Sequence, residues 1–247
     1  MTRLRIPLLL LAAAAALLAC VKQSPLAGLT VDEIRTTGLA KMDAGEPAKA
    51  REYFEALVGN SRADAAEAEY LVGMTYYRQK LYEEAYVHFG PDIDRYPASE
   101  WCDDAQLMKG EAKLAGVLPL DKDQLAVDEA LDDFTALLDE YESSTLVGRA
   151  RDGVARCRDL KARKLLAVGS FYAKTGKYKA AAIYFDVLAD EYAEFPGLAE
   201  ALFRAGECYE RLGEKETAAA RYRAVVTRFP ASPWATPAAA KLPGLTP

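Results

Sequence analysis

One pattern of small and aromatic residues returns five times along the chain, and it constrains the fold more than any other feature. Each copy has a glycine, an alanine in the segment that follows, and an aromatic residue four positions after the alanine. The copies carry Gly38, Ala50 and Phe54; Gly73, Ala85 and Phe89; Gly110, Ala130 and Phe134; Gly169, Ala181 and Phe185; and Gly206, Ala218 and Tyr222. Successive glycines are 35 to 37 residues apart, except the third and fourth, which are 59 apart. A period of this length indicates stacked helical units.

The pattern resembles the tetratricopeptide repeat, a helix–turn–helix unit of about 34 residues. Two antiparallel helices approach closely only where side chains are small, so we expect the glycine in the first helix and the alanine in the second. We expect the aromatic residues to fill the space between neighbouring pairs. Because one pair is too thin to bury its own apolar face, the pairs stack. The prediction is an all-α, right-handed α-solenoid of about five such repeats, near 31–62, 66–97, 100–142, 162–193 and 199–230.

Local signals mark the ends of this repeat domain, which we place at 30–233. Thr30 is a plausible helix cap because Glu33 follows three residues later, and Pro47 suits the first turn of a second helix. Residues 144–175 hold no proline, which predicts one long helix, or two nearly continuous ones, across the anomalous gap. The proline-rich end, 234–247, predicts a poorly ordered C-terminal tail with one turn of helix near 238–241.

The N-terminal segment has the features of a secretory signal. Arg3 and Arg5 precede an apolar run over 6–18, which is too short for an ordinary membrane span, and Ala19 precedes Cys20. A cysteine at this place resembles a bacterial lipobox, in which the thiol is lipidated before cleavage. We therefore expect a signal peptide over 1–19, lipidation at Cys20 and a tether over 20–29. An ordinary signal peptide that happens to hold a cysteine, or a short membrane anchor, are the alternatives.

Composition argues against several functions. The formal net charge of −6 disfavours binding to nucleic acid or to a general anionic membrane surface. Cys102, Cys157 and Cys208 have spacings that fit neither a metal site nor a disulfide framework, and we expect small buried side chains, although an oxidising compartment would permit one bridge. His88 is the only histidine. We therefore expect no catalytic residue, metal or cofactor.

Two charged segments have both a functional and a plain interpretation. Asp121, Asp123, Glu129 and Asp132 vaguely imitate a calcium loop, but Leu125 and Ala126 stand where an oxygen ligand and the turn glycine belong. An acidic helix start, favoured by the helix dipole, explains them better. Seven basic residues form the second segment, either a solvated face or a docking surface for an acidic partner: Arg149, Arg151, Arg156, Arg158, Lys161, Arg163 and Lys164.

The first helix of the second repeat has two apolar faces. Val72, Gly73 and Tyr76 should face its partner helix, whereas Tyr70, Met74 and Tyr77 recur at i, i+4 and i+7 with Arg78 beside them. We expect this second face to line a concave peptide groove, extended by four residues of the neighbouring repeats: Leu39, Met42, Leu107 and Leu114. The chain's own N-terminal segment or neighbouring repeats could equally cover it.

A lipobox followed by five such repeats resembles the family of BamD, also called YfiO, the lipoprotein of the machinery that inserts β-barrels into the outer membrane. The most specific match is the run FYAKTGKYKAA at 171–181, and RYPAS at 95–99 and DDA at 103–105 are similar to repeat junctions of that family. The resemblance implies a non-enzymatic scaffold, anchored through lipid on Cys20 to the outer membrane and facing the periplasm.

The resemblance also implies the partners. N-terminal repeats of the family are associated with the C-terminal signals of unfolded barrel proteins, and the C-terminal repeats dock the POTRA domains of the BamA barrel. Tyr70, Met74, Tyr77 and Arg78 would then be signal contacts. Two alternatives remain: another envelope lipoprotein of this fold, such as a pilus pilotin or an activator of a peptidoglycan synthase, or a hydrolase that uses the acidic cluster around Asp121.

Overall fold

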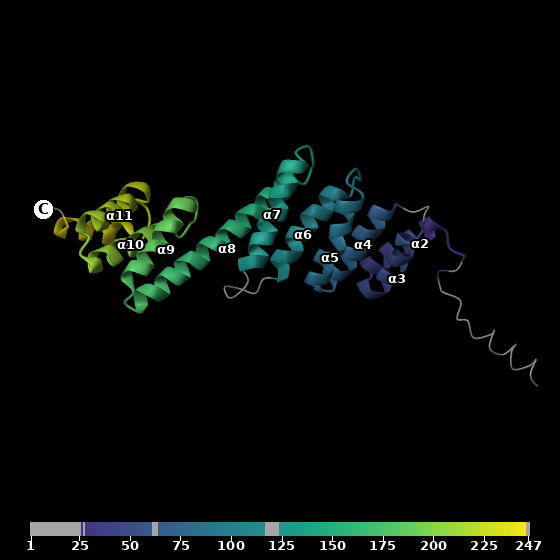
Figure 1. Cartoon of the computed structure of the whole chain (residues 1–247), viewed down its shortest axis with the longest axis horizontal. Helices are drawn as coiled ribbons and strands as arrows, with labels where there is room; N and C mark the ends of the chain where they lie inside the picture. The colour runs from purple at the N-terminus through teal and green to yellow at the C-terminus, as the bar shows by residue number, and fades with distance from the viewer. Residues whose placement is uncertain (1–25, 27, 61–63, 117–123, 246–247) are drawn as a thin grey trace, which may run out of the picture.

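The structure is a stack of antiparallel helix pairs. The computed structural model describes residues 26, 28–60, 64–116 and 124–245, and every regular element within these ranges is helical. The five pairs are α2 (Val31–Asp43) with α3 (Pro47–Val58), α4 (Ala65–Arg78) with α5 (Tyr82–Arg95), α6 (Cys102–Gly116) with α7 (Gln124–Glu140), α8 (Val147–Lys174) with α9 (Tyr178–Glu191), and α10 (Leu198–Leu212) with α11 (Lys215–Arg228). They follow one another along an elongated molecule (Figure 1), which confirms the predicted α-solenoid of about five tetratricopeptide-like repeats. The predicted signal peptide, Cys20 and most of the tether lie outside the described residues.

The first two helices begin where the local sequence signals place them. Thr30 Oγ1 accepts a hydrogen bond from the backbone N–H of Glu33, and the Glu33 carboxylate accepts one from the backbone N–H of Thr30 at 2.8 Å. This reciprocal pair satisfies amide groups that a helix start leaves unbonded. Pro47 occupies the first position of α3, where its missing N–H costs nothing. Both predictions of helix starts are therefore confirmed.

Each pair is held by an aromatic ring that lies on a glycine. A Cβ atom on Gly73 would stand 2.5 Å from Cε1 of Phe89, and one on Gly206 would stand 2.6 Å from Cε1 of Tyr222. The other three repeats make the same contact between their own two helices, with the glycine–aromatic pairs Gly38–Phe54, Gly110–Phe134 and Gly169–Phe185. The expectation that the aromatics fill the space between neighbouring pairs is therefore only part of the picture: Phe89 also packs with Met108 of the next pair, and Phe134 also meets Gly153 of α8. A ring needs the room that a missing Cβ leaves, so each ring lies on the glycine of its own pair.

Helix α8 accounts for the anomalous gap in the repeat spacing. It is a single helix of 28 residues. Of the two predicted possibilities, one long helix or two nearly continuous ones, the first is confirmed. A Cβ on Gly153 would clash with Phe134 of α7, and one on Gly169 would clash with Phe185 of α9. One helix therefore packs on two pairs in succession. Figure 1 shows it running between an N-terminal half, α2 to α7 with the start of α8, and a C-terminal half, the rest of α8 onward.

The C-terminal segment is ordered as far as it is described, to residue 245: the expected turn of helix near 238–241 is present within a longer helix, and the expectation of poor order around it is wrong. Residues Ala235–Lys241 form α12, and a 3-10 turn at Leu242–Gly244 follows. Trp234 packs on Phe203 with ring centroids 5.1 Å apart, and Ala238 is fully buried. The last repeat of a solenoid has an apolar face with no following repeat to cover it. Here α12 covers that face, and its contacts outweigh the proline content of the segment.

Two further observations concern the described parts of the chain. The side chains of Cys102, Cys157 and Cys208 are buried, and no disulfide joins them within the described residues, which agrees with the expectation of small core side chains. Burial raises the pKa of the Cys157 thiol to about 12 and that of Cys208 to about 11. Among the described helices, none is both long enough and apolar enough to cross a membrane.

Candidate peptide-binding surface

The second apolar face of α4 lies where this helix meets the following repeat. The Tyr70 ring is 5.8 Å from that of Phe89 and 5.3 Å from that of Trp101, measured between centroids. Met74 and Tyr77 pack against the same cluster of buried residues on α5 and α6, which consists of Ala85, Phe89, Ala105, Met108 and Ala112. All three side chains remain partly exposed. Helix α6 therefore covers part of the face, and the remainder is a shallow aromatic strip.

Arg78 stands at the end of this strip. It is exposed in the last turn of α4, one helical turn beyond Met74, so its guanidinium is open to solvent. The Tyr77 ring packs edge-on against Tyr82 with centroids 5.5 Å apart. The structure thus places the four predicted residues along one side of α4, three in a partly buried row and one at its exposed end.

Charged residues from two other helices act on Tyr77, and sequence reasoning did not assign them to this surface. Burial raises the pKa of the Tyr77 phenol, and Glu111 adds to the effect, whereas Arg156 and Arg149 oppose it. Arg156 forms an ion pair with Glu111 at 2.7 Å, which joins α8 to α6. The signal that could have found them is Gly153, because its packing on Phe134 brings the start of α8 beside the third repeat.

The expected extension of the strip is only partly present. Leu107 is fully buried beside Phe134 in the core of the third repeat, so it cannot line a groove. Its position faces the partner helix because α6 is rotated to place Gly110 on the Phe134 ring. Leu39 is exposed, Met42 packs on a buried cluster of the first two repeats, and Leu114 packs on a cluster of the third repeat and the start of α8.

The other candidate residues have structural partners. The His88 ring stacks on Tyr76 with centroids 4.7 Å apart, and Arg51 lies 4.2 Å above the same tyrosine ring. Glu129 forms an ion pair with Lys113 at 2.9 Å. Asp121 and Asp123 lie outside the described residues. Within the described ranges, no three histidine, cysteine or acidic side chains are grouped so as to hold a metal ion.

These features define a class. Stacked helix pairs with a glycine–aromatic contact in each make this chain a tetratricopeptide-repeat protein, a class whose extended surfaces bind other chains. The family model described as "YfiO: Outer membrane lipoprotein" matches residues 29–224. The chain belongs to this family of outer membrane lipoproteins.

Individual relatives agree with this membership. The chain is 24% identical over 206 residues to "Outer membrane protein assembly factor BamD" of Caulobacter vibrioides, covering 83% of this chain and 68% of that protein. It is 28% identical over 113 residues to the protein of the same name from Xylella fastidiosa, covering 46% of this chain and 39% of that protein. Among solved structures, "TPR2AB-domain:pHSP90-complex of yeast Sti1" matches 87% of this chain and 82% of that chain with a TM-score of 0.50 and 11% identity. This last likeness shows the fold alone.

Proposed function

We propose that the chain is a non-enzymatic scaffold in the assembly of β-barrel proteins of the outer membrane. The observation that carries the proposal is the family match over 29–224, supported by the name of the relative that covers most of the chain. In this role the protein binds unfolded clients and a BamA-like barrel component. Lipid on Cys20 holds it to the outer membrane on the periplasmic side.

The aromatic strip on α4 is the proposed client site. Outer-membrane barrels commonly end in an aromatic residue with a free carboxylate. Tyr70 and Tyr77 supply rigid rings for the aromatic side chain, Met74 adapts to its shape, and the exposed Arg78 can pair with the carboxylate through two hydrogen bonds. The fourth and fifth repeats are the proposed docking surface for the POTRA region of the barrel component.

A peptide titration tests the client site directly. The probe is a fluorescently labelled C-terminal barrel peptide ending in phenylalanine, compared with its C-terminal amide. Tyr77→Ala and Arg78→Ala should each weaken binding by about 2 kcal/mol, as for other aromatic and arginine hot spots. Arg78→Lys should restore only part of the affinity because lysine lacks the two-pronged geometry. Arg223→Ala, at an exposed arginine of α11, is the matched control.

The outcomes separate the parts of this proposal. Equal affinity for the acid and the amide would remove Arg78 from recognition. No binding to any form would mean that α6 covers the strip too completely for a client. Co-purification from detergent tests the other half of the proposal, because a BamA-like partner should appear with the wild-type protein. Incorporation of labelled fatty acid into wild type but not into Cys20→Ala tests the anchor.

A further inference from the structure

A group of charged side chains joins the second repeat to the third. Lys113 of α6 forms ion pairs with Glu83 of α5 and with Glu129 of α7, both at 2.9 Å. Lys109, about one helical turn earlier on α6, forms an ion pair with Asp133 of α7 at 3.1 Å. Three helices from two repeats meet at this group, which we call the polar junction.

Asp133 has the least exposed side chain of the polar junction, at 8%. Its Oδ1 pairs with Lys109 and accepts a hydrogen bond from Nε2 of Gln106 at 3.1 Å. Its Oδ2 is shielded from solvent and receives no hydrogen bond from any described residue. Such a carboxylate is unfavourable when ionised, because the protein interior solvates a charge far less well than water does.

The other charges of the polar junction compensate Asp133 only in part. The titratable groups around it are Glu83 and Tyr86 of α5, Lys109 and Lys113 of α6, and Glu129 of α7. Lys113 is shared by Glu83 and Glu129, so Lys109 is the ammonium group left for Asp133. Three carboxylates thus meet two ammonium groups, which leaves an excess of negative charge.

These surroundings raise the pKa of Asp133 above its ordinary value of 3.8. Burial is the largest cause. It outweighs the opposing effects of Lys109 and of the hydrogen bond from Gln106, and Glu129 adds to the rise. A carboxyl with a raised pKa binds its proton more tightly in the folded state than in the unfolded state. The fold therefore gains stability from this group as the pH falls through its folded pKa.

The contacts between α6 and α7 do not depend on the charge of Asp133. Nε2 of Gln106 also donates a hydrogen bond to the backbone oxygen of Asp133 at 2.9 Å. Nζ of Lys109 lies 5.2 Å from the centroid of the Tyr86 ring, within the range of a cation–π contact. Protonation of Asp133 thus removes a buried charge and leaves both helices and the lysine with partners.

We propose that Asp133 is a proton-sensitive switch for the packing of the third repeat. In its ionised form α7 separates from α6 more readily, and in its protonated form the pair stays closed. The step is the transfer of one proton from solvent to the carboxylate, and no other bond changes. Local opening of this kind is possible because each repeat of a solenoid contacts only its neighbours. The switch does not depend on the proposed function.

Hydrogen exchange in the full chain measures the opening of α7. After correction for the intrinsic exchange rate, amides of α7 in wild type should slow about threefold relative to Asp133→Asn as the pH falls from 7 to 4. The reason is that the asparagine cannot take up the proton. Asp132→Asn, at an exposed neighbouring position on α7, is the matched control and should behave as wild type does.

A direct titration keeps the test independent of how well the asparagine variant folds. The NMR signal of the Asp133 carboxyl carbon in the wild-type chain should titrate with a midpoint above 3.8. Lys109→Met removes the opposing ammonium group and should move the midpoint to a still higher pH. A midpoint at or below 3.8 in wild type would overturn the proposal. Equal pH dependence of α7 exchange in wild type and Asp133→Asn would overturn it as well.

Discussion

The two halves of the molecule use the same repeat chemistry but build different cores. In the C-terminal half, buried residues from α9 to α12 form one continuous cluster that includes Phe185, Leu202, Tyr222 and Ala238. In the N-terminal half, buried residues form three separate clusters around Phe54, Phe89 and Phe134. When one of several separate clusters opens, less buried apolar surface becomes exposed than when a continuous cluster opens. The comparison teaches that repeats of one pattern can share a single core or keep separate cores, and α12 contributes Ala238 to the shared core.

Polar contacts reinforce the same difference. In the C-terminal half, Glu210 of α10 accepts hydrogen bonds from Tyr222 and from Lys241 of α12. These bonds connect α12, which covers the end of the solenoid, to the last repeat. Among the described helices, α8 is the element that packs against helices of both halves. In a solenoid, stability is approximately a sum of repeat and nearest-neighbour terms. We therefore expect the halves to respond separately to local damage.

The largest expected effect comes from filling the glycine–aromatic contacts, one in each half. Gly73→Leu and Gly206→Leu place a side chain where even a Cβ would lie within 2.6 Å of a ring atom. Overpacking of this kind costs roughly 1–3 kcal/mol. Hydrogen exchange should show faster exchange in α4 and α5 for Gly73→Leu, and in α10 to α12 for Gly206→Leu, with the other half protected in each case.

The matched control is Gly148→Leu. This glycine lies in the first turn of α8, and a Cβ added to it would meet no neighbouring atom within 4 Å. The melting temperature of this variant should stay close to that of wild type. If Gly206→Leu instead accelerates exchange equally in both halves, the molecule unfolds as one unit and the comparison fails.

A smaller effect on stability is expected from removing the ion pair that holds α12 on the last repeat. Burial opposes ionisation of Glu210, but hydrogen bonds from Lys241 and Tyr222 outweigh it, and the pKa of this carboxyl is lowered from 4.5. A lowered pKa in the folded state gives stability that is present above the unfolded pKa and is lost as pH falls through the folded pKa. Glu210→Gln should therefore cost about 1 kcal/mol at neutral pH.

The pH dependence is the sharper measurement. The difference in unfolding free energy between wild type and Glu210→Gln should be constant from pH 7 to pH 5 and should shrink once the pH falls below the ordinary pKa of 4.5. Glu207→Gln, at an exposed position of the same helix, is the control. A difference that persists undiminished at pH 3 would mean that the charge of Glu210 does not hold α12 in place.

The sequence predicted the repeated parts of this fold because each repeat carries its own complete signal. Gly206 and Tyr222 lie on consecutive helices of one pair, so the contact between them is local, and its counterpart recurs in every repeat. The ordered C-terminal segment was missed for the opposite reason. Prolines such as Pro237 and Pro243 are local signals against order, whereas the segment is ordered by a contact between Trp234 and Phe203, which are separated in the chain by the whole of α11.

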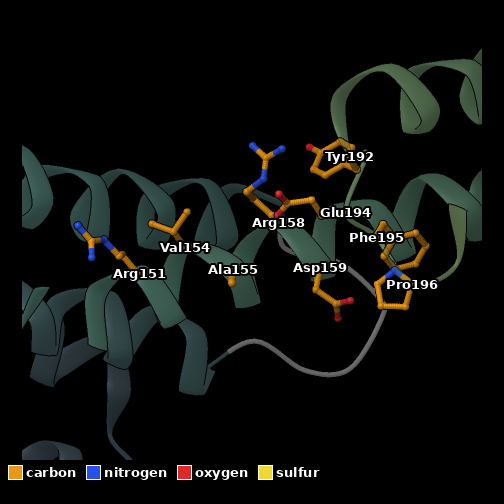
Figure 2. A pocket seen from close by; sticks show the side chains of 9 residues that line it. All are labelled: Arg151, Val154, Ala155, Arg158, Asp159, Tyr192, Glu194, Phe195 and Pro196. Carbon is orange, nitrogen blue, oxygen red and sulfur yellow. The ribbon is translucent and has the colours of Figure 1, made fainter. Parts of the chain in front are cut away.

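The candidate surfaces were predictable only in part. The spacing of Tyr70, Met74 and Tyr77 places them on one face of a helix, but it does not show how far the next repeat covers them. The rotation of α6 that buries Leu107 depends on Gly110 and Phe134 meeting across two helices. The hollow between α8 and the segment that joins α9 to α10 (Figure 2) depends on which residues of one long helix are left without a neighbour, and helical periodicity does not reveal that.

The smallest predicted effect concerns the turn between α4 and α5. Lys80 has a φ of 62°, whereas glycine takes the corresponding left-handed position in three other repeats: Gly45, Gly176 and Gly213. This conformation costs a residue with a Cβ roughly 1–2 kcal/mol. Lys80→Gly removes that cost but adds up to about 1 kcal/mol of freedom to the unfolded chain. The variant should therefore gain about 0.5 kcal/mol of unfolding free energy, the difference between these two effects.

Since the gain falls in the N-terminal half, hydrogen exchange in α4 and α5 should slow while that in α10 to α12 stays unchanged. Lys80→Ala keeps the strained backbone and should gain nothing. Equal stabilities of the glycine and alanine variants would mean that backbone strain at this turn does not weaken the N-terminal half.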